Sequence, residues 1–422
     1  MREKILAITR SATFRHTGIV TTATVINGIL GFVFFWWVAR VFDAKTLGEF
    51  SVAVTASGLV TDIAVVGTET GTVNFVGKYI KKEKEKALRF LKLAFETKIV
   101  VCVLVVVIGW FLVPFFAIYF FKNSSLILPL RLSLFISVGL LLFGFATSSL
   151  QAIQKFNIWG LVNISSNFTR LVFMAILLAT GSFALQSGLI IQTVAPIIFF
   201  ISSLLFLPRF LGVKNENKVL QEFFHYNKWV ALFTILAAVA SRLDIFFVTR
   251  ILGLTAVGIY SVAVTLSSII PQLVGAIGTV VAPKLAGQNN KTQAIEYLKK
   301  LQVFVGVLSL LGIVSGIFVG YFFIRHFYKP EYFASFVPFI VLLVAQVVFL
   351  FSIPVHMTTI YYFSYPKLFV TISLVNVIVV TIFCLVLIPI FGIAGAALAI
   401  LFGSISNFII PAFWVFGKFK ND

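Results

Sequence analysis

The sequence contains very few of the side chains from which metal sites and redox centres are built. Its 422 residues include two cysteines and four histidines, and the histidines do not have the spacing of metal ligands. It also lacks a glycine-rich phosphate loop and the nucleophile elbow of hydrolases. We therefore expect no bound metal, no cofactor, no catalytic residues and no energy supply from ATP bound to this chain.

Charged side chains are scarce as well, and this scarcity identifies the class of protein. Only 11% of the residues are charged, whereas 60% are hydrophobic. No soluble core could bury so many apolar side chains, so the surrounding solvent must be lipid. The apolar runs are continuous rather than alternating, which favours membrane-spanning helices over a β-barrel.

A helix that crosses a bilayer needs about 20 apolar residues, and the chain offers about 12 such stretches separated by short polar segments. The sequence therefore predicts an all-α membrane protein with about 12 transmembrane helices. The predicted spans are residues 17–41, 48–77, 95–120, 128–151, 159–181, 187–211, 224–251, 256–283, 302–325, 334–358, 367–389 and 393–416.

Acidic side chains are the scarcer of the two charge types, with 14 Asp and Glu against 33 Lys and Arg and a net charge of +19. The Lys and Arg gather in alternate loops, most densely between Lys78 and Lys92. Because cytoplasmic loops accumulate positive charge, the bias predicts a multi-pass protein of the cell membrane with both termini in the cytoplasm. No separate basic domain exists, so we expect membrane lipids as partners and no nucleic acid.

A short repeat divides the chain into two related parts. The sequence "SVAVT" occurs at residues 51–55 and again at residues 261–265, an offset of 210 residues. Further identities at the same offset flank it, which makes a chance match improbable. Among these flanking pairs are Val38 with Val248, Arg40 with Arg250, Gly48 with Gly258, and Phe50 with Tyr260.

The offset spans six predicted helices, and since six is even, both copies enter the membrane in the same direction. We therefore predict two parallel six-helix bundles related by a pseudo-two-fold axis along the membrane normal. The N-terminal half covers residues 1–211, a cytoplasmic linker covers residues 212–222, and the C-terminal half covers residues 223–422. Two parallel bundles around a shared cavity favour a transporter. The small residues of "SVAVT" are expected to serve helix packing.

The stretch "LVNVIVVTIFCLVLIPIFGIAGAALAILFGS", residues 374–404, resembles the late-helix signature of polysaccharide flippases. The turns "ARVFDAKTLGEFSVAV" and "TRILGLTAVGIYSVAV" are similar to turns of the same family, within the multidrug, oligosaccharidyl-lipid and polysaccharide exporter superfamily. The resemblance implies twelve helices in two bundles, alternating access and export of a lipid-linked oligosaccharide. Lipid II flippases carry two extra helices, so the chain fits that branch less well.

Polar side chains inside predicted spans are candidates for substrate binding, because a charge near the bilayer centre costs roughly 2.5–3.5 kcal/mol. Arg170 shares one helix face with Asn163 and Asn167. An arginine suits the phosphate or diphosphate of a lipid-linked donor, and the amides suit sugar hydroxyls. Arg242 is the second candidate for the phosphate. Alternatively, Arg170 reaches the membrane interface or pairs with an acid.

Three acidic residues inside predicted spans are candidates for coupling to a proton or sodium gradient. Asp62 and Glu69 are seven residues apart, which in one continuous helix places them on one face about 10 Å apart. A carboxylate in such a place can exchange protons. Asp244 is the third candidate. The alternative for these residues is a structural ion pair, with Arg170 or Arg242 as the partner of Asp62 or Glu69.

Three functions remain open. A lipid-linked oligosaccharide flippase is favoured, working as a monomer with or without coupling to H⁺ or Na⁺. A multidrug or toxin extruder coupled to Na⁺ or H⁺ shares the fold, but the arginines would repel cationic drugs. A membrane glycosyltransferase or polymerase would need acidic residues at the outer face, where the sequence offers only Asp43, Glu49 and Glu331.

Overall fold

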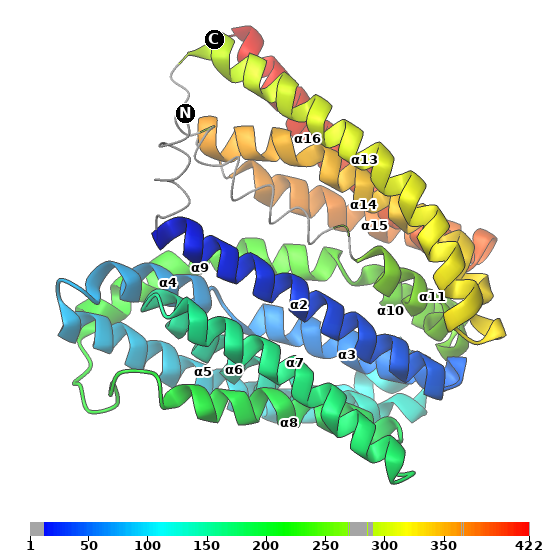
Figure 1. The fold of residues 1–422 in the computed structure, drawn as a ribbon, viewed down its shortest axis with the longest axis horizontal. Helices are drawn as coiled ribbons and strands as arrows, with labels where there is room; N and C mark the ends of the chain where they lie inside the picture. Colours follow the sequence, from blue (N-terminus) through cyan, green and yellow to red (C-terminus); the bar gives the residue numbers. More distant parts are fainter. Residues whose placement is uncertain are drawn as a thin grey trace. The chain divides into compact units, whose positions relative to one another are not determined.

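The long apolar stretches form α-helices, because a helix satisfies all its backbone hydrogen bonds within one segment. The computed structural model describes residues 12–268, 270, 285, 290–363, 365 and 367–421 (Figure 1). Most of the predicted span 256–283 beyond residue 268 lies outside these described residues.

Ten helices in the described part of the chain are long and apolar enough to cross a membrane, which confirms the prediction of an all-α, multi-pass membrane protein. The exact number of twelve helices and the two-bundle symmetry stay predictions. The first helices are α2 (Ala12–Val41), α3 (Ala44–Ala64), α4 (Thr68–Tyr79), α5 (Lys84–Phe115), α6 (Ile127–Ala152), α7 (Phe156–Ala179), α8 (Leu185–Leu204) and α9 (Asn217–Ala240). They are followed by α10 (Leu243–Leu252), α11 (Leu254–Ser267), α13 (Lys291–Phe327), α14 (Phe336–Met357), α15 (Leu368–Phe391) and α16 (Ile393–Asn421).

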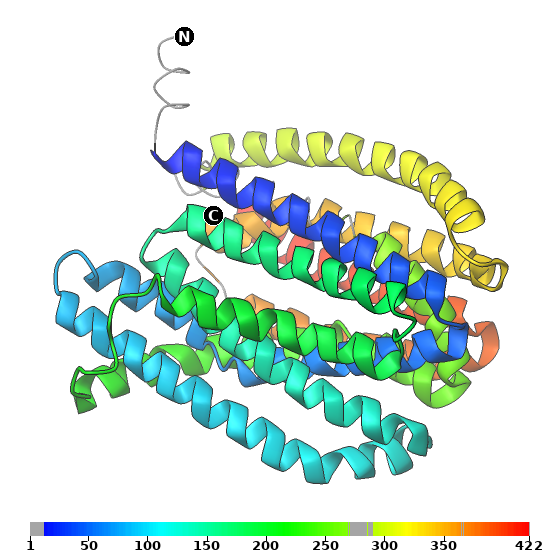
Figure 2. The same ribbon diagram turned by 60° about the horizontal axis from the view of Figure 1, so that its bottom comes forward.

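One compact unit contains residues 12–34 and 53–235. Its central helix is α6, which packs against α4, α5, α7 and α8 (Figure 2). Buried aromatic side chains join α4, α5 and α9: the ring of Phe75 stacks on Phe90 at 4.5 Å, and Phe223 lies 6.1 Å from both. These three helices therefore share one apolar core at this end of the unit.

The second compact unit contains residues 35–52 and the described residues from 236 onward. Here α14 packs against α13, α11 and α16, and α15 packs against α16 and α10 (Figure 1). The unit also includes the end of α2 and the start of α3, so both helices have residues in each unit.

The two copies of "SVAVT" touch through their first residues, which both lie in the second unit. The hydroxyl of Ser51 donates a hydrogen bond to the hydroxyl of Ser261 at 2.9 Å, and both residues are buried. Gly48 and Gly258 let the backbones approach: a Cβ on Gly48 would lie 1.9 Å from the carbonyl oxygen of Leu254. The expectation that this sequence serves helix packing is confirmed.

The predicted single span 48–77 is wrong, because the structure breaks it into α3 and α4. The chain turns at residues 65–67, where Val66 and Gly67 adopt φ angles of 47° and 71°. Glycine adopts this left-handed conformation without steric cost. The hydroxyl and the backbone N–H of Thr68 both donate to the carbonyl oxygen of Val65, at 2.6 and 2.9 Å, which fixes the turn between the two helices.

The predicted single span 224–251 is also wrong, because α9 ends at Ala240 and α10 begins at Leu243. At the break, the Ser241 hydroxyl donates to the carbonyl oxygen of Ala238 at 3.0 Å, and Arg242 has non-helical dihedral angles. A serine side chain that bonds the local backbone competes with the helical pattern. Arg242 therefore lies at the N-terminus of a new helix, α10.

The predicted linker 212–222 is tied to α5 by polar contacts. Arg89 forms ion pairs with Glu85 and Glu216, and Lys92 donates to the carbonyl oxygen of Val213 at 2.8 Å. Asn215 also donates to Glu96 at 2.9 Å. Single exposed ion pairs stabilise a protein little, but several contacts together fix the path of this segment.

Candidate functional site

A cluster of polar side chains lies between α2 and α7 in the first unit. The amide of Asn167 donates to the side-chain oxygen of Asn27 at 3.0 Å, and the Arg170 guanidinium donates to the side-chain oxygen of Asn167 at 3.3 Å. The Nε of Arg170 is buried and has no hydrogen-bond partner among the described residues. The cluster thus holds a cationic group that is only partly satisfied by the protein.

Asn163 belongs to the same face of α7, but its side chain serves the helix itself. Its amide donates to the carbonyl oxygen of Trp159 at 2.8 Å. The structure therefore brings Asn167 and Arg170 together with Asn27, and it places Asn163 one turn away.

A groove of about 550 Å³ lies along α2 and α7, on the N-terminal side of this cluster in both helices. Ala23 of α2 and Gly160 of α7 line it, one helical turn before Asn27 and Asn163 respectively. Its other lining residues are Gly18, Ile19, Thr22, Asn157, Leu161 and Ile164. A mostly apolar groove has the chemistry to hold the apolar part of a molecule, and the guanidinium of Arg170, further along α7, can bind an anionic part.

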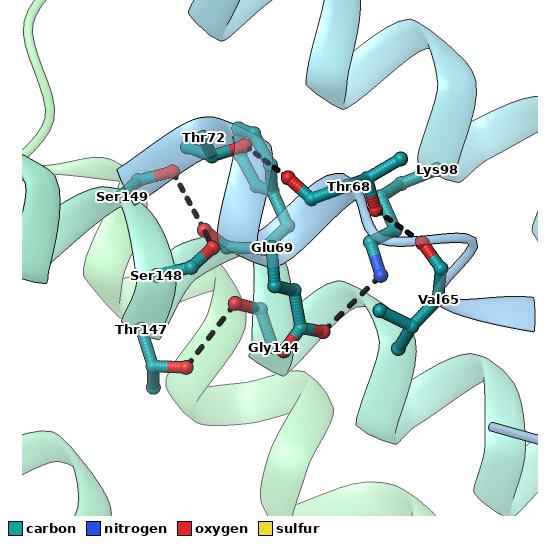
Figure 3. A network of polar contacts seen from close by, with 10 residues as sticks. Val65, Thr68, Glu69, Thr72, Lys98, Gly144, Thr147, Ser148 and Ser149 are labelled. Atoms are coloured by element: carbon teal, nitrogen blue, oxygen red, sulfur yellow. Dashed lines mark hydrogen bonds and ion pairs between the residues drawn. The ribbon is translucent and has the colours of Figure 1, made fainter. Parts of the chain in front are cut away.

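Glu69 pairs with a lysine that the sequence analysis did not single out. Its Oε1 accepts a hydrogen bond from the ammonium of Lys98 on α5 at 3.2 Å (Figure 3). The Lys98 side chain is 2% exposed, while the Glu69 side chain is 33% exposed. The alternative that Glu69 pairs with Arg170 or Arg242 is therefore wrong, since Lys98 is its ion-pair partner.

Space for the Glu69 carboxylate comes from a glycine on α6. A Cβ on Gly144 would lie 2.2 Å from Oε1 of Glu69, which is far inside van der Waals contact. The hydroxyl groups of Thr147 and Ser148, also on α6, donate to backbone carbonyl oxygens of α6, at 3.2 Å to Gly144 and 3.1 Å to Phe145 (Figure 3). The pair thus lies where α4, α5 and α6 meet.

Asp62 does not share a helix with Glu69, because the break at 65–67 lies between them. Asp62 is in the last turn of α3, and Glu69 is in the first turn of α4. The expected common face of one helix is therefore wrong, since the backbone changes direction between the two residues.

Arg242 and Asp244 lie in the second unit, around the start of α10. Arg242 donates to the carbonyl oxygen of Ala238 at 3.1 Å. Asp244 is 5% exposed and accepts a hydrogen bond from the hydroxyl of Tyr260 at 2.8 Å, while its Oδ1 has no hydrogen-bond partner among the described residues. Tyr260 replaces Phe50 of the other copy of the repeat, so the acidic residue and its donor occur in one copy only.

Sequence reasoning missed Asn27, Lys98 and Tyr260 as partners in these clusters. Lys98 had a readable signal, because it is a charge inside the predicted span 95–120. Asn27 and Tyr260 are uncharged and had no comparable signal.

Gly144→Ala should lower the melting temperature of the purified protein by about 2–5 °C, because the new methyl group forces the Glu69 carboxylate away from Lys98. Thermal unfolding in detergent measures the effect. In a Glu69→Ala background the same change should have little effect, because the clashing carboxylate is gone. Gly77→Ala is the matched control, since its Cβ would meet an ordinary contact at 3.5 Å. An equal loss with and without Glu69 would contradict the assigned contact.

The family model of polysaccharide biosynthesis proteins matches residues 14–287 of the chain. None of the curated proteins matches it. A structure of a multidrug resistance MATE family transporter of the MOP superfamily, facing inward, is 13% identical with a TM-score of 0.76 and covers 94% of this chain and 95% of that chain. The lipid II flippase MurJ in an inward closed conformation is 17% identical with a TM-score of 0.77, covering 94% and 87% respectively. A structure of a MOP superfamily transporter from Pyrococcus furiosus, whose binding pocket is described as having reverse polarity, is 12% identical with a TM-score of 0.56. It covers 96% of this chain and 93% of that chain. At these identities, the likeness concerns the fold.

Proposed function

Because the chain belongs to the polysaccharide biosynthesis protein family, we propose that it is a flippase that moves a lipid-linked oligosaccharide from the cytoplasmic to the outer leaflet of the cell membrane. It works by alternating access, as a monomer, with both termini in the cytoplasm. The fold that it shares with MurJ and MATE transporters supports a transport function over an enzymatic one.

The cluster of Asn27, Asn167 and Arg170 carries the proposal. An arginine presents a planar fork of donors that matches a phosphate or diphosphate, and the buried Nε of Arg170 is a donor that no described residue satisfies. The side-chain amides of Asn27 and Asn167 add donors and acceptors for sugar hydroxyls. The groove along α2 and α7 accepts the adjoining part of the lipid chain.

Arg242 is the phosphate-binding candidate of the second unit, and Asn163 supports the face of α7 that carries Arg170. Asp62, Glu69 and Asp244 couple transport to a proton or sodium gradient. Asp244 supports this role best in the second unit, because one of its buried oxygens has no hydrogen-bond partner among the described residues.

The proposed function is tested in proteoliposomes that contain the purified protein and a fluorescent, undecaprenyl diphosphate-linked oligosaccharide. A membrane-impermeant reagent that destroys the fluorophore is added outside the vesicles. In protein-containing vesicles it should destroy the fluorescence of both leaflets, because flipping brings the inner-leaflet lipid to the outer leaflet. In protein-free vesicles it should destroy only the fluorescence of the outer leaflet. Uptake of a cationic dye such as ethidium is measured in parallel. Dye transport without movement of the lipid-linked glycan would contradict the flippase and indicate a multidrug extruder.

A further inference from the structure

Lys98 carries an ammonium group that is buried in a membrane helix and forms an ion pair with Glu69. Its residue is 1% exposed, and its ammonium lies 3.2 Å from Oε1 of Glu69 (Figure 3). A buried charge is tolerated when it is paired, and breaking such a pair by removing one partner is strongly destabilising. The charge of Glu69 and the position of Lys98 are therefore linked.

The pair ties the start of α4 to α5. Glu69 is in the first turn of α4, directly after the break at residues 65–67, where a carboxylate also interacts favourably with the helix N-terminus. Val66 has a φ of 47°, which is unfavourable for a β-branched residue, so the surrounding contacts must hold this turn. The Glu69–Lys98 ion pair is one of these contacts.

Few other charged or titratable groups face this pair among the residues whose side chains the structure describes. On α5, Cys102 lies one turn beyond Lys98. On α6, Gly144, Thr147 and Ser148 are uncharged, and Arg131 packs on Trp110 three helical turns away. On α9, Asn227 lies against Gly71, and His225 lines a surface pocket beside Phe75. On α3, Asp62 precedes the break and has an interaction of its own.

We propose that Lys98 is the internal counter-ion that positions Glu69, and that proton uptake by Glu69 releases Lys98 and loosens the turn at residues 65–67. A proton from water binds the carboxylate, the N–H···O ion pair is lost, and Lys98 keeps its own proton. The net charge of the pair changes from zero to +1, and the ammonium must then find hydroxyl groups or water. The inference rests on the proposed coupling role of Glu69 and is independent of the transported substrate.

A proton fits this site better than a sodium ion. Sodium needs several oxygen ligands around the carboxylate, and the Lys98 ammonium already occupies the position next to Oε1. A second cation there would be repelled by Lys98, whereas a proton adds no volume.

Hydrogen–deuterium exchange of the backbone amides at residues 65–72 tests the proposal on the full-length protein in nanodiscs, without any substrate. Rates are divided by the intrinsic rate at each pH, from about pH 8 to about pH 4. Wild type should exchange slowly at high pH and at least tenfold faster at low pH, because local opening becomes easier. Glu69→Gln should exchange fast at every pH. Lys98→Arg should restore the wild-type profile, whereas Lys98→Met should lose the pH dependence.

The control is Glu296→Gln, which breaks the exposed Lys300–Glu296 pair on α13 and should leave exchange at residues 65–72 unchanged. A wild-type rate that does not vary with pH would overturn the proposal, even if Glu69→Gln raises it, because the pair would then be only structural. A response to sodium at fixed pH, with none to pH, would also overturn it. If Lys98→Met fails to fold, the proposal is tested by the pH profiles of the other three proteins: wild type, Glu69→Gln and Lys98→Arg. Failure of these profiles leaves the glycan-flipping assay unaffected, so the two proposals fail separately.

Discussion

Arg170→Ala is expected to lower the rate of lipid-linked oligosaccharide flipping by about 100-fold or more, while the protein keeps its fold. Removing one partner of a buried, charge-assisted hydrogen bond costs about 2–5 kcal/mol, and a diphosphate uses both arms of the guanidinium. Among the described residues, the Arg170 side chain donates a hydrogen bond to Asn167 alone, so its loss disturbs few native contacts. Initial rates in the proteoliposome assay measure the effect, and circular dichroism checks the fold.

Two further variants separate charge from geometry at this position. Arg170→Lys keeps the positive charge and loses the fork, so it should recover part of the rate and remain about tenfold below wild type. Arg209→Ala, which removes an exposed arginine between α8 and α9, should flip at the wild-type rate. Wild-type flipping by Arg170→Ala would remove this residue from the binding site. Equal rates for lysine and arginine would show that charge alone is needed.

Gly258→Ala is expected to have the largest effect on stability and to lower the free energy of unfolding by about 3 kcal/mol or more. A Cβ on Gly258 would lie 1.8 Å from the carbonyl oxygen of Ala44 and 2.7 Å from its carbonyl carbon. Both are backbone atoms that cannot rotate away, so the two helices would have to separate and the Ser51–Ser261 hydrogen bond would be lost. The measurements are the yield of monodisperse protein and its Tm.

Gly417→Ala is the matched control for this substitution. Gly417 also lies inside a helix of the second unit, α16, and its Cβ would meet nothing within 4 Å. Alanine is the better helix former, so this change should keep or slightly raise Tm. Similar Tm values for Gly258→Ala and Gly417→Ala would mean that the helices at Gly258 can separate at little cost.

Much of the fold could be predicted because lipid restricts what a chain can do. Long apolar runs have to become helices, and the predicted spans correspond to helices wherever the chain is described, apart from the two breaks and the end of span 187–211, where α8 stops at Leu204. The resemblance to a polysaccharide family is confirmed by the match of the polysaccharide biosynthesis protein model over residues 14–287. The breaks escaped prediction because a single glycine, such as Gly67, is common inside membrane helices, and only the three-dimensional structure shows its left-handed conformation.

The polar clusters were less predictable, because a partner is chosen by packing and not by spacing along one helix. Asn167 and Arg170 are three residues apart, so their contact on α7 could be expected. The partners Asn27 and Lys98 come from other helices, 140 and 29 residues away from Asn167 and Glu69. Asp62 and Glu69 show the opposite case, in which a spacing argument fails because the helix that it assumes is interrupted.

The contact between Ser51 and Ser261 joins residues that occupy the same position in the two copies of the repeat. Such a contact is isologous, as in a symmetric homodimer: Gly48 faces the backbone near Gly258, and Gly258 faces the backbone near Gly48. A side chain gained on one partner can be accommodated only by a backbone shift that also displaces the other. The two glycines, 210 residues apart, therefore behave as one site under mutation, and drift in one copy of the repeat is restrained by the other.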